Sequence, residues 1–262
     1  MLASGQFNKY MKYAIGEIIL VVVGILLALQ INNWNNRKSE EAKIRQYAMS
    51  LIQDLEEDIL MIRKRRLQTV QIMNRIDSLA NYVNGKDVDE ISNIDVLFLS
   101  LKILYMPFSW NRTTLEQMKS SGSMQFIQDL DLVKMIGEYD AFTYHMDEDY
   151  INDKSKSDQA IELMNRVTDN NYPNMEAMRK EIFLNVNNVL FDEFHAFTKE
   201  EYFKAKNYNL PLRTDNIKEL QEAVNSLVRL QVHFSIRTDA ELPQLEQEAS
   251  DLIDRLTQTY LD

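Results

Sequence analysis

The 262-residue chain contains 6 glycines, 4 prolines and no cysteine, where average usage would give roughly thirty glycines and prolines together. The glycines stand too far apart for a dinucleotide-binding, P-loop or nucleophile-elbow motif, and the lack of cysteine excludes disulfides, thiol nucleophiles and cysteine-ligated metal sites. The net charge is −11, and Lys9, Lys12 and Glu17 are the only charged residues in the first 36, so a charge of −12 falls on the rest. Nucleic-acid binding needs a basic surface and is therefore not expected.

The first predicted element is a membrane-spanning helix from Tyr13 to Ile31. These nineteen residues include twelve Leu, Ile and Val residues and a single acidic residue, Glu17. At about 1.5 Å per residue they cover roughly 28 Å, close to the ~30 Å hydrocarbon core of a bilayer. A signal peptide would be followed by a small-residue cleavage site, but here Trp34 follows among asparagines, as is typical of a membrane interface. We therefore expect residues 1–36 to form an uncleaved membrane anchor with a short N-terminal tail and an interfacial collar, in which Trp34 is the interfacial anchor.

One face of this helix carries residues suited to helix–helix contact. At 100° per residue, Glu17, Val21, Gly24, Ala28 and Ile31 lie within about 40° of one line along the helix. Gly24 and Ala28 form a small-xxx-small pair that permits close approach, and Glu17 would favour a polar partner over lipid. Self-association through this face and a lipid-facing helix whose Glu17 reaches headgroup water are both compatible with the sequence.

A long amphipathic helix is predicted next, from about Ser39 to a stop at Gly85. Its seam follows alternating spacings of four and three residues through positions 48, 52, 55, 59, 62, 66, 69, 73, 76, 80 and 83. The same spacing is typical of a coiled coil, which would place the seam against another chain. Packing against the chain's own later helices is favoured, because these are amphipathic as well. The basic run 63–66 is expected to be a solvated face that balances nearby acidic residues.

The rest of the chain is predicted to be helical, with prolines 107, 173, 211 and 243 as breaks. A capping box of Thr113 and Glu116 is expected to open a short helix that closes at Gly122. Because no segment alternates with period two, the predicted fold class is all-α: an N-terminal transmembrane helix continues into a long helix and an antiparallel helical bundle formed by residues 37–262. The remaining predicted helices lie within 91–105, from Asp129 or Asp131 to about Val167, over 174–204, and over 215–261 with a kink or break near Pro243.

The three histidines give no clear catalytic or metal site. His145 and Asp149 share a helical face, but a zinc site needs three or four ligands. Asp192 and His195 have the spacing of half a carboxylate di-iron site, without a second copy, and the phenylalanines around them indicate a core histidine. Arg112 is expected to hold a carboxylate in the bundle rather than an anionic ligand. We therefore predict no catalytic residue, no metal and no cofactor, and do not expect an enzyme.

Two stretches resemble a known family. They are GEIILVVVGILLALQINNWNN, from Gly16 to Asn36, and NRTTLEQMKSSGSMQFIQD, from Asn111 to Asp129. Both are similar to a family of uncharacterised single-pass membrane proteins of Gram-negative bacteria, the domain-of-unknown-function family sixty-ninety. The resemblance implies a bacterial inner-membrane anchor with a helical domain beyond it, and no established activity or ligand. Members usually begin with a longer basic segment, which implies a cytoplasmic N terminus and a periplasmic bundle, although only Lys9 and Lys12 precede the anchor here.

Two functions fit these features. The first is a non-enzymatic interaction or scaffold module, in which the anchor fixes an oligomer and the bundle docks a partner. The alternative is a periplasmic sensory or ligand-binding domain without its own signalling output. No kinase, cyclase or methyl-accepting pattern accompanies the anchor, so the scaffold is expected. The expected partners are the lipid bilayer, a second copy through the membrane helix and an unidentified protein.

Overall fold

The computed structural model describes residues 3–100, 107–171 and 210–261, and every regular element in these ranges is helical. The all-α prediction is therefore confirmed. The helix expected over 174–204, with Asp192 and His195, lies outside the described residues. The elements are α1 (Ala3–Val83), α2 (Asn93–Ser100), α3 (Thr113–Ser120), α4 (Leu130–Val167), α7 (Ile217–Ile236) and α8 (Leu242–Tyr260), with the short turns η1 (Val88–Glu90) and η2 (Ser123–Phe126) and the π turn η4 (Arg237–Glu241).

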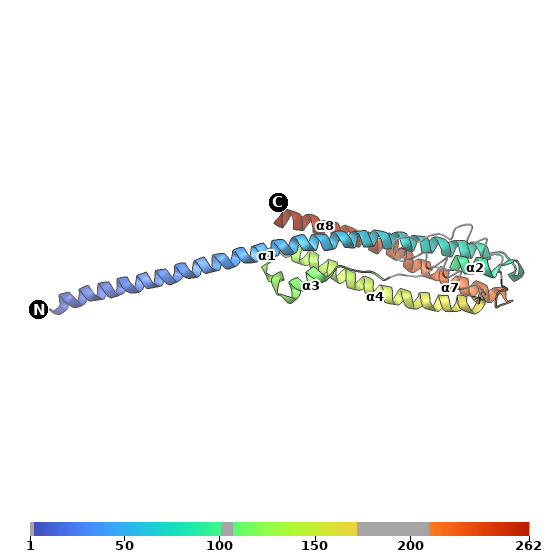
Figure 1. Ribbon diagram of the computed structural model, residues 1–262, viewed down its shortest axis with the longest axis horizontal. Coiled ribbons are helices and arrows are strands. Elements are labelled where there is room, and N and C mark those ends of the chain that lie inside the picture. Colours follow the sequence, from blue (N-terminus) through green and yellow to red (C-terminus); the bar gives the residue numbers. More distant parts are fainter. Residues whose placement is uncertain (1–2, 101–106, 172–209, 262) are drawn as a thin grey trace.

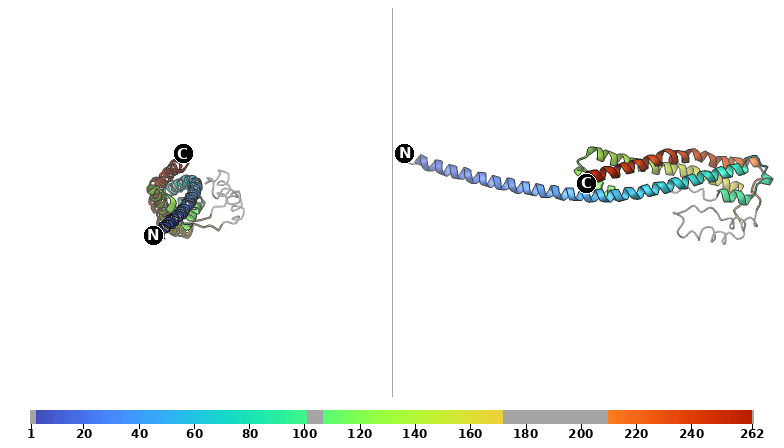
Figure 2. Two further views of the ribbon diagram at one scale, coloured as in Figure 1. Left: turned by 90° about the vertical axis from the view of Figure 1, so that its left-hand side faces the viewer. Right: turned by 90° about the horizontal axis from the view of Figure 1, so that it is seen from above.

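The long helix α1 organises the molecule. Its first half projects alone, and its second half packs along the continuous run of α7, η4 and α8, which also packs against α4 (Figure 1). Seen from above, the helix keeps one gently curved path from the free end into the bundle (Figure 2). Helix α4 runs parallel to α1, whereas α7 and α8 run antiparallel to both (Figure 1). The predicted long helix ends at Val83, and Gly85 takes the left-handed conformation, with φ 73°, that stops it.

The buried seam of α1 is a regular heptad that differs from the predicted one at every second position. Asp58 is buried in place of the predicted Ile59, and Arg65 is buried while Arg66 is exposed. The sequence prediction chose Ile59 because the seam was identified by apolar side chains. An acid such as Asp58 can be buried only where hydrogen-bond partners compensate for its removal from water, and its partners come from other elements of the folded chain. As expected, the seam packs against the chain's own helices. Its buried members are Ile44, Ala48, Leu51, Leu55, Asp58, Ile62, Arg65, Thr69, Ile72, Ile76, Leu79 and Val83.

A polar layer divides the core of the bundle into two apolar clusters. One cluster joins α1 up to Ile62 with α3, α8 and the first half of α4. The other joins α1 from Ile72 onward with α2, α7 and the end of α4. Between them lies a set of buried polar residues, which we call the polar belt: Arg65, Gln68, Thr69, Asp153, Ser157, Arg237 and Thr238.

The helix ends agree with the sequence predictions in part. Asp129 caps α4, its carboxylate accepting hydrogen bonds from the backbone N–H groups of Asp131 and Leu132, and Gly122 closes α3 with φ 67°. The predicted capping box at Thr113 is wrong, because α3 begins at Thr113 itself without a side-chain cap. Its first turn is satisfied by α1 instead, since the Thr114 N–H donates to Asp54 Oδ2 (3.3 Å).

The C-terminal half of the bundle also differs in detail from the prediction. The cap of α7 is Asn216, one residue after the predicted Asp215. The break expected near Pro243 is a π turn over Arg237–Glu241, after which Pro243 lies in the first turn of α8. The chain therefore continues as helix through this point, and the π turn places its residues at the polar belt.

Candidate functional site

The projecting part of α1 carries exposed side chains from Ile15 onward. Every side chain from Ile15 to Ser39 is exposed, and in the described residues α1 carries the one stretch long and apolar enough to cross a membrane. The predicted contact face, formed by Glu17, Val21, Gly24, Ala28 and Ile31, lies on this stretch. A Cβ added at Gly24 would meet no atom within 4 Å, so the face is open to a partner or to lipid.

Trp34 marks the transition from the apolar segment to the bundle. Its ring is exposed, and the Lys38 ammonium lies 4.4 Å from the ring centroid, which is within cation–π range. The first buried residue, Ile44, follows ten positions later, at about 15 Å along the helix. The bundle therefore begins a short, fixed distance beyond the apolar segment.

Arg237 is the centre of the charged part of the polar belt. This side chain is 7% exposed, and its Nε donates to Asp153 Oδ2 (3.1 Å) on α4. Its Nη1 contacts Asp149 Oδ2 (3.0 Å) and donates to Glu241 Oε2, four residues further along the π turn. One guanidinium thus serves three carboxylates from two elements.

Two histidines from different helices border the same carboxylates. His145 Nε2 lies 3.1 Å from Asp149 Oδ2 and 3.5 Å from Glu241 Oε1, and its side chain is 53% exposed. His233 Nδ1 lies 3.4 Å from Asp153 Oδ1. The sequence identified the pairing of His145 with Asp149 but missed Glu241, Arg237 and the contact of His233. No local spacing indicates these contacts, because they join α4 to a segment 80 or more positions away.

The group of His145, Asp149 and Glu241 has the composition of a cation site, and its potential ligand atoms lie within 4.8 Å of one another. However, the guanidinium of Arg237 contacts both of these carboxylates. A metal ion among them would sit beside a fixed positive charge, which Coulomb repulsion disfavours. The geometry therefore favours an internal ion-pair network over a metal centre.

Burial changes the acid strength of this network. Removal from water raises the pKa of Asp153 above the usual aspartate value, while the charge and hydrogen bond of Arg237 oppose that rise. The network also lies at a π turn, a distortion of the α-helix that is frequent at functional sites. The polar belt therefore combines a buried carboxylate of raised pKa with a π turn.

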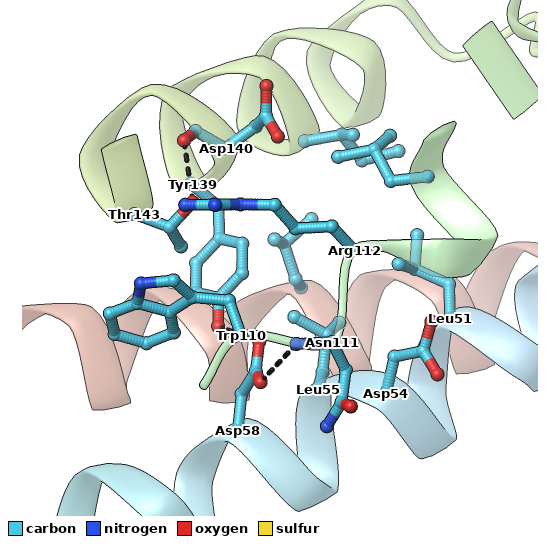
Figure 3. Close-up of a pocket in the computed structure, with 13 residues that line it drawn as sticks. Leu51, Asp54, Leu55, Asp58, Trp110, Asn111, Arg112, Tyr139, Asp140 and Thr143 are labelled. Carbon is cyan, nitrogen blue, oxygen red and sulfur yellow. Dashed lines mark hydrogen bonds between the residues drawn. The ribbon is translucent and has the colours of Figure 1, made fainter. Parts of the chain in front are cut away.

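A second buried acid, Asp58, joins α1 to the loop before α3 (Figure 3). Its Oδ1 accepts from the Asn111 backbone N–H (2.9 Å), and its Oδ2 accepts from the Tyr139 hydroxyl (2.8 Å). Burial raises the pKa of Asp58, against the effect of both hydrogen bonds. The cavity beside it measures about 20 Å³, which is room for one water molecule. This junction is therefore suited to holding the loop and not to binding a ligand.

Arg112 has the structural role that the sequence predicted. Its Nη2 donates to Asp147 Oδ2 (2.8 Å) and to Thr143 Oγ1 (3.0 Å), both on α4. The guanidinium also lies over the Tyr144 ring, 4.1 Å from the centroid. The loop before α3 is thus fastened to α4 as well as to α1.

The basic run 63–66 is the expected solvated face only in part, because Arg63 and Arg66 are exposed but make contacts with other helices. Arg63 Nε donates to Glu246 on α8 (2.8 Å), and Arg66 Nε donates to the Thr238 carbonyl in the π turn (2.8 Å). Arg65 is buried, and its Nη1 donates to Gln68 (2.8 Å). The run therefore connects α1 to the C-terminal helices.

A family model described as "Family of unknown function (DUF6090)" matches residues 17–155, from Glu17 in α1 to Ser155 in α4. The match includes His145, Asp149 and Asp153 of the charged network, while Arg237 and Glu241 lie beyond it. No curated protein and no solved structure matches the chain significantly. Because the match covers more than half of the sequence, the chain belongs to this family of unknown function.

Proposed function

We propose that the protein is a membrane-anchored, non-enzymatic scaffold, whose apolar segment lies in a bilayer and whose helical bundle docks a partner protein. The continuity of α1 is the observation that carries this proposal. One unbroken helix supplies both the exposed apolar segment and the buried seam of the bundle. An anchor of this kind fixes the height and orientation of the bundle at a membrane surface, which is what a scaffold requires.

The polar clusters support a binding role over a catalytic one. The three carboxylates of the network are engaged by Arg237, and the cavity at Asp58 has room for one water molecule. Catalysis would need a group positioned to act on a substrate in a pocket of suitable size. We therefore propose that the activity of the bundle lies on its surface.

Membrane anchoring is tested by placing charges in the apolar segment. Val22→Arg together with Leu26→Arg adds two charges, each of which is costly near the bilayer centre, and should release the full-length protein from membranes washed with alkaline carbonate. The matched control is Leu60→Arg with Leu67→Arg, at exposed positions of the same helix within the bundle. The control should remain in the membrane fraction, and release of the control to the same extent would contradict anchoring by the apolar segment.

We also propose that the protein resides in a bacterial inner membrane with the bundle in the periplasm. A cysteine at Ser155, which is exposed on α4, should react with a membrane-impermeant maleimide in intact spheroplasts. A cysteine at Ser157, which is buried two residues away, is the control and should react only after denaturation. Protection of the Ser155→Cys variant until lysis would reverse the orientation.

Self-association would proceed through Glu17, Val21, Gly24, Ala28 and Ile31. Gly24→Ile adds bulk where two helices would approach closely and should weaken the signal in a membrane two-hybrid assay. Leu26→Ile, on the opposite side of the helix, should leave the signal unchanged. Equal signals from both variants would exclude this face.

Docking of a partner is tested with a photo-crosslinking residue on the exposed surface of the bundle. Ile151 on α4 and Val232 on α7 are large apolar residues that are mostly exposed, so either position is accessible to a bound protein. A scaffold should give a discrete cross-linked partner in cells. A sensory domain would instead show a shift in melting temperature with a small ligand and no such adduct.

A further inference from the structure

A short stretch of α1 between the apolar segment and the bundle carries an excess of positive charge. Residues 37–45 include four basic side chains and two acidic ones, whereas the whole chain has a net charge of −11. The four basic residues are Arg37, Lys38, Lys43 and Arg45, and all of them are exposed. A strongly acidic protein therefore has a locally basic surface next to its apolar segment.

The two basic residues nearest the apolar segment have no anionic partner within the chain. Neither Arg37 nor Lys38 forms an ion pair with any residue in the described ranges. Glu40 and Glu41 stand within about one helical turn and still leave both cations unpaired. In the bundle, by contrast, the guanidinium of Arg112 lies 2.8 Å from a carboxylate oxygen. The two cations of the stem are therefore available to an anion from outside the chain.

The side chain of Lys38 leans toward the apolar segment. Its Nζ lies 4.4 Å from the ring centroid of Trp34, which stands four positions earlier. This direction is the usual one, because side chains of an α-helix point toward its N-terminus. Arg37 follows Trp34 by three positions and lies on the same side of the helix. We call the surface formed by Trp34, Arg37 and Lys38 the collar face.

The collar face lies within reach of lipid headgroups when the apolar segment spans a bilayer. Arg37 and Lys38 stand six and seven residues beyond Ile31, about 9–10 Å along the helix. The headgroup region extends roughly 5–7 Å beyond the hydrocarbon core, and long basic side chains reach back toward it. Arg45 stands about 21 Å beyond Ile31, which is too far for such a contact.

We propose that the collar face binds the phosphate of an anionic phospholipid headgroup. Guanidinium and ammonium groups donate charge-assisted hydrogen bonds to phosphate oxygens, and the indole of Trp34 is suited to the membrane interface. This inference rests on the proposed membrane anchoring, because a lipid meets these residues only when the apolar segment lies in a bilayer. It holds for either orientation of the bundle.

The open surface of the collar face favours a lipid over a soluble phosphate compound. Its three side chains are exposed, so no wall of the protein encloses a small anion there. A bilayer supplies phosphate groups at this height at high local concentration. The acidic bundle does not oppose such binding, because its first buried residue, Ile44, lies about 15 Å beyond Trp34. That separation is roughly twice the Debye length at physiological ionic strength.

The quenching of Trp34 fluorescence by brominated lipids tests the proposal in the full-length protein. The protein would be reconstituted in mixed vesicles of phosphatidylcholine and phosphatidylglycerol, with bromine on the acyl chains of one lipid or the other. Trp110 gives a constant background, because the next residue is bonded to Asp58, about 36 Å beyond Trp34 along α1. The ratio of the two quenching efficiencies then measures which lipid lies beside Trp34.

Brominated phosphatidylglycerol should quench Trp34 of the wild type more strongly than brominated phosphatidylcholine. Arg37→Gln together with Lys38→Gln should lower the relative affinity for phosphatidylglycerol by about five-fold or more, since each basic residue near an anionic surface contributes to binding. Arg45→Gln is the matched control, because it removes an exposed cation of the same stretch that lies beyond the headgroups, and it should retain the preference. An unchanged preference in the double variant, or an equal loss in Arg45→Gln, would overturn the proposal.

Two further measurements separate the possible sources of failure. Excess glycerol phosphate at constant ionic strength should leave the lipid preference unchanged, and loss of the preference would indicate a site for soluble phosphate compounds and overturn the assignment to lipid. Equal quenching by both lipids would overturn this inference while supporting the anchor. Absence of quenching by either lipid would contradict the membrane anchoring itself, and this inference with it.

Discussion

Asp58 is an acidic residue in the buried seam of α1. It occupies a core position in the seam of α1, where an apolar residue would be expected, and it is only 2% exposed. Its two oxygens accept hydrogen bonds from Asn111 on the loop before α3 and from Tyr139 on α4. The acid is tolerated because both bonds are made within the bundle, so its burial depends on elements distant in sequence.

Tyr139→Phe tests the strength of this junction. The substitution removes the hydroxyl that donates to Asp58 and leaves the ring in the core, so the free energy of unfolding should fall by about 1–2 kcal/mol. Chemical denaturation measures this change. Tyr144→Phe is the control, because Tyr144 is 48% exposed, and its effect should stay within about 0.5 kcal/mol. Similar losses in both variants would contradict the role given to the hydrogen bond.

The buried acids also predict how stability depends on pH. Burial raises the pKa values of both Asp58 and Asp153 in the folded state above those in the unfolded chain. The folded protein therefore binds protons more tightly, and the contribution of these two groups to stability should increase as the pH falls through their raised pKa values toward the usual aspartate value of 3.8. It should decrease again as the pH rises. Asp58→Asn removes one of these groups, so urea unfolding at several pH values should show a weaker dependence in this variant. An unchanged dependence would show that Asp58 does not contribute.

At the scale of the helices, two glycines with different backbone conformations make opposite predictions. Gly122 has φ 67°, which other residues adopt at a cost, so Gly122→Ala should lower the free energy of unfolding by about 1 kcal/mol. Gly137 lies within α4, and an added Cβ there would meet no atom within 4 Å. Gly137→Ala should therefore raise the free energy of unfolding by about 0.5–1 kcal/mol. Chemical unfolding of both variants measures these changes, and changes of the same sign in the two variants would contradict this assignment.

Local sequence signals predicted where helices begin and end more successfully than they predicted the contacts between helices. The stop at Gly85 and the close at Gly122 depend on neighbouring residues and were predicted, and the cap at Asp129 was one of two predicted candidates. The start of α3 was not, because its first turn is satisfied by Asp54 from α1. Such a cap leaves no trace in the spacing of the local sequence.

The candidate site shows the same division more strongly. The pair of His145 and Asp149 was visible as an i, i+4 spacing on one helix. Its charged partners Arg237 and Glu241 could not be predicted, because the pairing depends on α7 running antiparallel to α4 and on the π turn. The seam of α1 was displaced by one residue at Asp58 for the same reason, because its partners Asn111 and Tyr139 come from other elements.

For the whole molecule, the structure makes α1 both the exposed stem and a core element of the bundle. The apolar stretch makes no contact with the rest of the described chain, and the buried heptad begins at Ile44. Because the helix is unbroken between these parts, any anchoring of the stem would fix the bundle as well. The family match covers α1 from Glu17 onward and the first part of α4, whereas α7 and α8 lie beyond it.

A spin-label accessibility scan along α1 in lipid vesicles tests the account most directly. Labels at single positions from 15 to 60 would be compared for collision with oxygen, which dissolves in lipid, and with a water-soluble nickel complex. We predict that positions 18–29 are accessible to oxygen and shielded from nickel on every side of the helix. Positions after Trp34 should be accessible to nickel, and from Ile44 onward accessibility should follow the heptad of the buried seam. Nickel accessibility throughout 18–29, or a break in helical periodicity between Trp34 and Ile44, would contradict a membrane anchor rigidly joined to the bundle.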